Sequence, residues 1–141
     1  MSLMTAIDVS ASGLTAQRKR MEVLVSNLVN ANTTQRADKE PFRRKDVVFS
    51  ATDPQLTFGA AFEDAVQGVE ISKVVTDRSD PIKRYEPGHP NADKDGYVSY
   101  PNVNPMEEMV NILSATRSYE ANLQAVSMAK DMAQKTLELL K

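Results

Sequence analysis

The chain has 141 residues, a formal net charge of −2 and no cysteine. The length suits one ordinary domain or a small domain with extensions, and the near-neutral charge gives no reason to expect nucleic acid as the main partner. The lack of cysteine excludes disulfides, thiolate metal sites and cysteine nucleophiles. We expect no membrane-spanning helix, which needs ~20 apolar residues in a row. We also expect no cleaved signal peptide, because the first residues lack an early positive charge and a long apolar run.

Residues 3–31 are predicted to form one long amphipathic helix. Apolar residues recur there in a seven-residue repeat, the spacing that keeps one stripe facing a partner helix. The members of this seam are Leu3, Ile7, Leu14, Met21, Leu24, Leu28 and Ala31. Residues 30–34, Asn-Ala-Asn-Thr-Thr, favour caps and turns, so we expect the helix to end there.

Residues 33–104 differ in character, because six of the seven prolines and four of the five glycines lie there. Such a density of Pro and Gly is typical of short strands joined by turns. Strands are predicted at residues 46–50, 69–76, 81–86 and 97–100. Residues 51–68 show no clear period and are expected to form a loop. The middle of the chain should therefore be a small β-rich unit with a thin core.

A second long helix is predicted from residue 105 to residue 141. Asn104 suits the N-cap, Pro105 the first turn, and Glu107 the end of a capping box. The seam of this helix consists of Met109, Ile112, Tyr119, Leu123, Val126, Ala133, Leu137 and Leu140. A second apolar row widens it and consists of Met106, Val110, Leu113, Ala121, Ala125, Met128, Met132 and Leu139.

These patterns predict an α+β fold in which two long terminal helices pair as a coiled-coil-like core beside a small β-rich segment. We expect three segments, 1–33, 34–104 and 105–141. The last helix would be about 55 Å long, more than the middle segment could cover. Part of its surface is therefore expected to contact other chains. Except for the two alanines, the seam residues of both helices form the predicted assembly interface.

No catalytic, cofactor-binding or metal site is predicted. Asn91, Asp93, Asp95 and Gly96 match the first positions of an EF-hand loop, but its twelfth position, which needs a bidentate Glu, is Asn102. A polar turn is the better interpretation.

Three other polar groups have similarly simple interpretations. His89 lies between Gly and Pro and has no recognisable nucleophile to serve, so we interpret it as a turn residue. Glu107 and Glu108 do not share a helix face and are interpreted as helix-start charge. The basic run at residues 43–45 is interpreted as a solvated loop or an interface contact.

Two separated motifs resemble the signatures of bacterial flagellar axial proteins, the family of rod, hook and related subunits. The N-terminal motif comprises residues 11–17, Ala-Ser-Gly-Leu-Thr-Ala-Gln, and residues 25–33, Val-Ser-Asn-Leu-Val-Asn-Ala-Asn-Thr. The C-terminal motif is residues 108–122, from Glu-Met-Val-Asn to Tyr-Glu-Ala-Asn. Val29 stands where the family commonly has Ala. Shorter stretches between residues 85 and 104 are similar to those of proximal rod subunits.

The resemblance implies a structural subunit that leaves the cytoplasm through the flagellar type III export apparatus and assembles into a helical tube in the basal body. The terminal helices would form the inner core (D0-type) and the middle segment would face outward. The tube is the drive shaft that transmits torque across the periplasm. Implied partners are copies of the chain itself, the rod proteins FlgB, FlgF and FlgG, and the FliE adaptor at the membrane ring. No cofactor, nucleic acid or membrane span is implied.

Three alternatives stay open. The chain could be another rod or axial subunit, a soluble rod-associated adaptor or export chaperone, or a cell-wall enzyme. An adaptor would be recovered as a soluble complex, whereas a rod subunit should stay in isolated basal bodies. An enzyme would need a catalytic set of residues that the sequence does not show.

Overall fold

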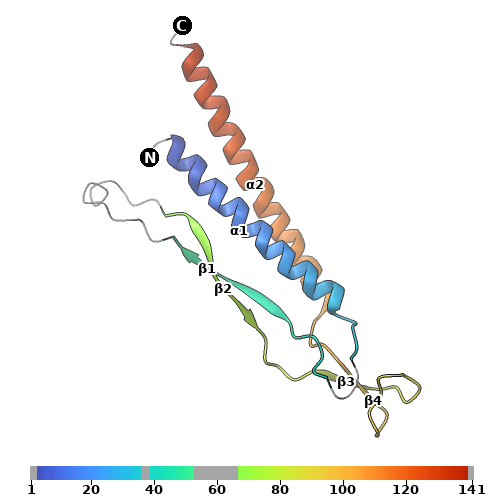
Figure 1. Cartoon of the computed structure of the whole chain (residues 1–141). Helices are drawn as coiled ribbons and strands as arrows, with labels where there is room; N and C mark the ends of the chain where they lie inside the picture. Colours follow the sequence, from blue (N-terminus) through green and yellow to red (C-terminus); the bar gives the residue numbers. More distant parts are fainter. Residues whose placement is uncertain (1–2, 36–38, 53–66, 140–141) are drawn as a thin grey trace. The chain divides into compact units, whose positions relative to one another are not determined.

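The structure, a computed structural model, describes residues 3–35, 39–52 and 67–139. Along the chain it contains α1 (Leu3–Asn30), β1 (Lys45–Ala51), β2 (Val69–Thr76), β3 (Ile82–Tyr85), β4 (Tyr97–Tyr100) and α2 (Pro105–Glu138) (Figure 1). The α+β prediction, with long helices at both ends and short strands between them, is confirmed. Most of the expected loop at 51–68 lies outside the described residues, as does Leu140. No helix in the described part is apolar enough to cross a membrane.

Both helix boundaries near the strands have the predicted chemistry. After α1, the Thr33 amide and hydroxyl both donate to the Asn30 carbonyl, at 3.1 and 2.8 Å, and close a turn that ends the helix. At the start of α2, the Asn104 side-chain oxygen accepts a hydrogen bond from the Met106 amide at 3.1 Å. Asn104 is therefore a true N-cap, with Pro105 in the first helical position, where its missing N–H costs nothing.

The chain divides into two compact units, and each helix contributes to both. The first unit contains Met1–Lys19, Val48–Lys73 and Ser114–Lys141, and the second contains Arg20–Val47 and Val74–Leu113.

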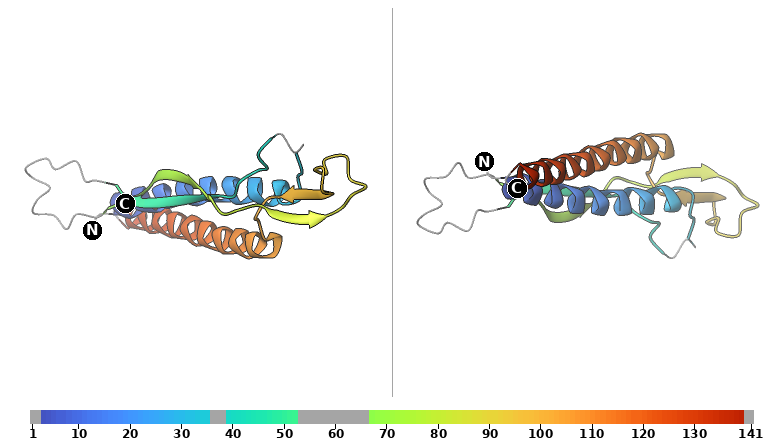
Figure 2. Two further views of the ribbon diagram at one scale, coloured as in Figure 1. Left: turned by 90° about the horizontal axis from the view of Figure 1, so that it is seen from below. Right: turned by 90° about the horizontal axis from the view of Figure 1, so that it is seen from above.

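In the first unit, the N-terminal half of α1 lies beside the C-terminal half of α2 (Figures 1 and 2). Gly13 makes this close approach possible, because a Cβ at this position would lie 2.8 Å from the Asn122 side-chain nitrogen. Ala16, Ala115 and Ala129 are buried in the same unit. The Val69 amide donates to the Ser12 hydroxyl at 3.0 Å and so joins β2 to α1. Small side chains thus allow the backbones to pack closely.

The strands form two separate two-stranded sheets, β1 with β2 and β3 with β4. The Thr52 amide donates to the Gly68 carbonyl at 2.9 Å, and the Asp77 amide donates to the Arg44 carbonyl at 2.7 Å. These two bonds show that β1 and β2 run in opposite directions. Most side chains of β2 are exposed, so this ribbon has little core of its own.

The second unit holds the antiparallel β3–β4 hairpin, in which Ile82 pairs with Tyr100 and Tyr85 with Tyr97. The rings of Tyr85 and Tyr97 meet edge-on with centroids 5.4 Å apart. Between the strands, Asp93 accepts hydrogen bonds from the amides of Asp95 and Tyr97. This confirms the interpretation of the EF-hand-like stretch as a polar turn. Apolar burial in this unit centres on five residues, Leu24, Ala31, Val98, Pro101 and Val103.

Candidate functional site

The predicted interface residues differ in how much of their surface the chain itself covers. On α1, Leu24 is fully buried at 2% exposure. The other five are half-buried: Leu3, Ile7, Leu14, Met21 and Leu28. On α2, the half-buried members are Ile112, Tyr119 and Val126, and the exposed members are Met109, Leu123 and Leu137. Leu140 lies outside the described residues. Their role in contacts between chains stays a prediction.

One row of α2 residues, spaced alternately by four and three positions, is turned toward the rest of the chain. Its buried or half-buried members are Glu108, Ile112, Ala115, Tyr119, Asn122, Val126, Ala129 and Ala133. Five of these eight residues are alanine, carboxylate or amide. Apolar periodicity located its large members and Ala133 but missed Glu108, Ala115, Asn122 and Ala129, because small and polar residues carry little weight in such a pattern.

A second row on α2 is apolar and wholly exposed. Its members are Met106, Val110, Leu113, Ala121, Ala125, Met128, Met132 and, directly after the helix, Leu139; this is the row that widens the predicted seam. Its six large side chains are between 54% and 87% exposed. Arg117 interrupts the row between Leu113 and Ala121. Single exposed apolar residues are ordinary, but this many on one face of a helix mark an interaction surface. We call these eight residues the exposed apolar row.

A third row on α2 is polar and also exposed. It consists of Arg117, Glu120, Gln124, Ser127, Asp131, Gln134 and Glu138. This row is adapted to water, as the outer face of an amphipathic helix should be. The helix therefore has three faces. One packs within its own chain, the polar row faces water, and the exposed apolar row is covered by the chain no more than it is suited to water.

A buried polar cluster joins both helices to the start of β1 in the second unit. Asn27 is 0% exposed, and its side-chain nitrogen donates to the Lys45 carbonyl at 2.7 Å and to Glu108 Oε2 at 3.1 Å. Its side-chain oxygen accepts from the Lys45 amide at 2.9 Å. Glu108 is 1% exposed, and its Oε1 accepts from Arg44 Nε at 2.7 Å. We call Asn27, Arg44 and Glu108 the polar cluster.

The polar cluster corrects two interpretations drawn from the sequence. Arg44 is not a solvated loop residue, because its guanidinium is paired with a buried carboxylate. Glu108 is more than helix-start charge, since burial without a partner would be very costly for it. Burial acts to lower the pKa of Arg44, but the hydrogen bond and charge of Glu108 outweigh burial and hold that pKa above its usual value. Sequence reasoning missed the cluster because its members are up to 81 residues apart.

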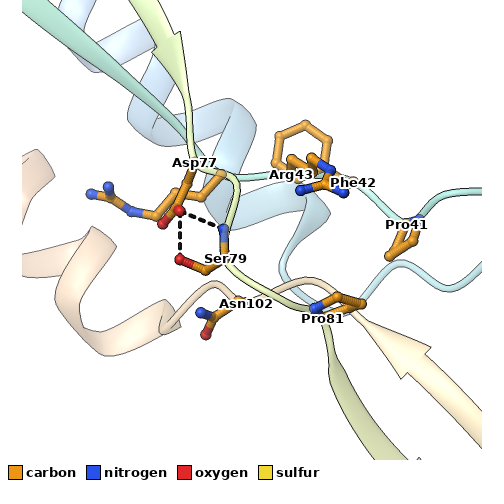
Figure 3. Close-up of a pocket in the computed structure, with 8 residues that line it drawn as sticks. Pro41, Phe42, Arg43, Asp77, Ser79, Pro81 and Asn102 are labelled. Atoms are coloured by element: carbon orange, nitrogen blue, oxygen red, sulfur yellow. Dashed lines mark hydrogen bonds between the residues drawn. The ribbon is translucent and has the colours of Figure 1, made fainter.

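Beside Arg44, the chain forms a small hollow lined by residues of the loops that flank the strands (Figure 3). Its free volume is about 10 Å³, which is room for about one water molecule. Inside it, the Asp77 carboxylate accepts hydrogen bonds from the Ser79 amide at 2.8 Å and from its hydroxyl at 2.5 Å. These bonds, together with the charges of Arg44 and Arg43, hold the pKa of Asp77 below its usual 3.8. The hollow is a packed turn and does not have the size of a ligand site.

Comparison with known proteins places these features in a family. Residues 7–35 match the model for flagella basal body rod proteins, and residues 94–139 match the C-terminal model for flagellar basal body rod FlgEFG proteins. The chain is 42% identical over 139 residues to the flagellar basal-body rod protein FlgC of Salmonella typhimurium, covering 99% of this chain and 98% of the other. The chain belongs to the FlgC family of flagellar basal-body rod proteins.

Other FlgC proteins match just as completely. The Bacillus subtilis FlgC is 42% identical over 150 residues, covering 99% of each chain. The Aquifex aeolicus FlgC is 39% identical over 145 residues, covering all of this chain and 99% of its own. Within this FlgC-family chain, the two matched family models fall on the two helices and their flanks. They include Asn27 and Glu108 of the polar cluster, and the second also includes the whole exposed apolar row.

Proposed function

We propose that the chain is a structural subunit of the flagellar basal-body rod, which assembles helically into the drive shaft of the motor. The observation that carries this proposal is the exposed apolar row of α2. That helix already has one face packed within its chain and one face suited to water, so the third face is available to neighbouring subunits. Family membership indicates that the chain assembles with other subunits, and the exposed apolar row is the surface through which we expect it to do so. No catalytic step is part of the proposal.

The exposed apolar row is large enough to contribute substantially to assembly. Fully burying one large apolar side chain contributes about 1.5–3 kcal/mol. The six large members are more than half exposed in the single chain. Covering them would contribute on the order of 5–10 kcal/mol per subunit before the entropic cost of association is subtracted. A helical array also needs two different patches that meet each other, and the exposed side chains of α1, Val25 and Val29, offer a second patch.

The remaining assignments follow from family membership. Segments 1–33 and 105–141 would form the inner core of the rod, and segment 34–104 would face outward. Neighbours would be further copies of the chain, the rod proteins FlgB, FlgF and FlgG, and the FliE adaptor at the membrane ring. The subunit would reach the periplasm through the flagellar type III export apparatus. The predicted seam residues that are exposed, Met109, Leu123 and Leu137, would contribute to the same contacts.

The proposal is tested by replacing the native gene with a tagged copy and isolating basal bodies. A rod subunit stays with the basal bodies after detergent and salt washes, and its deletion stops swimming. Recovery only as a soluble complex with one partner would instead identify an adaptor. A cell-wall hydrolase would digest purified peptidoglycan, which the proposed subunit should leave intact.

A further inference from the structure

The polar cluster is the most specific packing feature shared by the two helices. The side-chain amide of Asn27 bonds both backbone groups of Lys45: its nitrogen donates to the carbonyl and its oxygen accepts from the amide. A neighbouring β-strand would satisfy the same two groups in this way. Glu108 uses one oxygen for Asn27 and the other for Arg44. The Arg44 carbonyl in turn accepts a hydrogen bond from the amide of Asp77, the residue directly after β2. One buried cluster thus fixes α1, α2 and the adjoining ends of β1 and β2 in the second unit.

The apolar side chains on the helices are poorly suited to set the register between α1 and α2. Among the described residues of both helices, Leu24 is the one large apolar side chain that is fully buried. The other buried apolar residues on the helices are alanines: Ala16, Ala115 and Ala129. Alanines fill no shaped hole, whereas large side chains that interlock distinguish one register from the next. The remaining large seam residues that the chain covers, such as Leu14 and Tyr119, are only half-buried. Apolar packing therefore opposes slipped arrangements only weakly.

The polar cluster opposes such slips strongly. A slip of α2 by one helical turn, about 5.4 Å, would bring Asn104 or Ile112 to the place of Glu108. Neither carries a charge, so the Arg44 guanidinium would lose its buried partner and keep only the longer contact to exposed Asp46, at 3.3 Å. Ile112 would also deprive the Asn27 amide of the second of its two acceptors. Buried ion pairs add little net stability, yet a buried group that loses its partner is heavily penalised. A buried polar group that fixes register is a well-attested use of this asymmetry.

We propose that the polar cluster is a registration device, which admits one register of α1 against α2 and of the start of β1 against both. The register-fixing role stands on the contacts alone; only its consequence for assembly rests on the proposed function. By fixing the register, the cluster would set the relative positions of the exposed apolar faces of the two helices, and so make one subunit geometry competent for assembly.

Disulfide trapping in the purified full-length chain tests the device directly, because the chain has no cysteine of its own. The register observed here is reported by the pair Gly13→Cys and Asn122→Cys. An ideal Cβ at residue 13 lies 3.2 Å from Asn122 Cγ, the place that the sulfur of Asn122→Cys would take. Two matched control pairs combine Gly13→Cys with Ser118→Cys or with Val126→Cys, one helical turn to either side.

Each pair is placed in three backgrounds: the unaltered chain, Glu108→Gln, and the double variant Arg44→Met with Glu108→Leu. The double variant removes both charges together, so its unfolding temperature should stay close to that of the unaltered chain. In the unaltered chain the 13–122 yield should exceed both control pairs by at least about tenfold. In the double variant we expect that yield to fall several-fold while a control pair rises. Glu108→Gln, which keeps the side-chain shape, should shift the yields in the same direction and decides the matter if the double variant does not fold.

Two results would overturn the proposal. If the 13–122 pair dominates equally in every background, the cluster does not set the register. If all three pairs fall together with the unfolding temperature, the cluster only holds the chain folded. The proposed function is judged separately, by swimming and basal-body content in a strain that carries the unaltered chain. Trapping could therefore support the device even if that strain showed that the chain is not a rod subunit.

Discussion

Exchanging Met128 for Asp separates an effect on assembly from an effect on folding. Met128 belongs to the exposed apolar row and is 59% exposed. Its neighbour Ser127 is exposed as well but belongs to the polar row. Ser127→Asp is therefore a matched control, with the same new charge one position away on the same helix.

The expected magnitudes for the two variants diverge only on assembly. In the free chain, Met128→Asp loses about 0.5 kcal/mol of helix propensity. Ser127→Asp loses a similarly small amount, because Asp131 lies four residues away and repels it by about 0.2–0.5 kcal/mol. Each change should lower the Tm by about 2 °C or less. On assembly, Met128→Asp forfeits about 1–2 kcal/mol of apolar burial and adds the several-kcal/mol cost of covering a carboxylate. A total of about 4 kcal/mol weakens each subunit contact roughly a thousand-fold.

The assay pairs thermal unfolding of the purified chains with swimming in soft agar and immunodetection in isolated basal bodies. We expect both variants to unfold within a few degrees of the unaltered chain. We also expect Ser127→Asp to swim normally and Met128→Asp to be absent from basal bodies. If Met128→Asp assembles as well as Ser127→Asp, the exposed apolar row is not an assembly surface and the reasoning from it fails.

Three further predictions concern the folded chain. Leu24→Ala should lower the free energy of unfolding by about 2–5 kcal/mol. Val25→Ala, at the next position and 46% exposed, should lower it by less than about 1 kcal/mol. Equal urea midpoints for the two variants would contradict the burial of Leu24. Gly96→Ala should cost about 1–3 kcal/mol in chemical unfolding, because Gly96 has a φ of 84°, and a stabilised variant would contradict the turn. Since the pKa of Asp77 lies below its usual 3.8, its contribution to stability is present above pH 3.8 and is lost as the pH falls through the lower folded-state pKa. Asp77→Asn should therefore lower the urea midpoint at pH 6 and converge with the unaltered chain in more acidic solution; a constant difference would exclude this linkage.

Local chemistry predicted most of the secondary structure correctly. The seven-residue apolar repeats, the N-cap at Asn104 and the dense Pro and Gly of the middle are each short-range signals. Each element forms close to where its own residues favour it, and β2 begins and ends at the predicted residues. The exposed apolar row was also visible as a pattern, although the pattern alone could not show which apolar row the chain covers itself.

The polar cluster could not be predicted in the same way. Asn27 and Glu108 are typical surface residues in composition, and they are buried here only because each finds its partner from a distant segment. The bonds of Asn27 to Lys45 and of Arg44 to Glu108 span 18 and 64 residues. Gly13 is similar, because the sequence marks it as a weak point in a helix while the structure uses its missing side chain to admit Asn122. Tertiary contacts of this kind leave no periodic trace in the sequence.

A density map of an intact basal body at side-chain resolution would show whether rod subunits join through the exposed apolar faces of the terminal helices. We expect Met128, Met132 and Leu139 of each copy to be covered by helices of neighbouring subunits, while Ser127 and Gln134 of the polar row stay hydrated. A map in which the exposed apolar row faces solvent, and the subunits meet only through their strands, would contradict it.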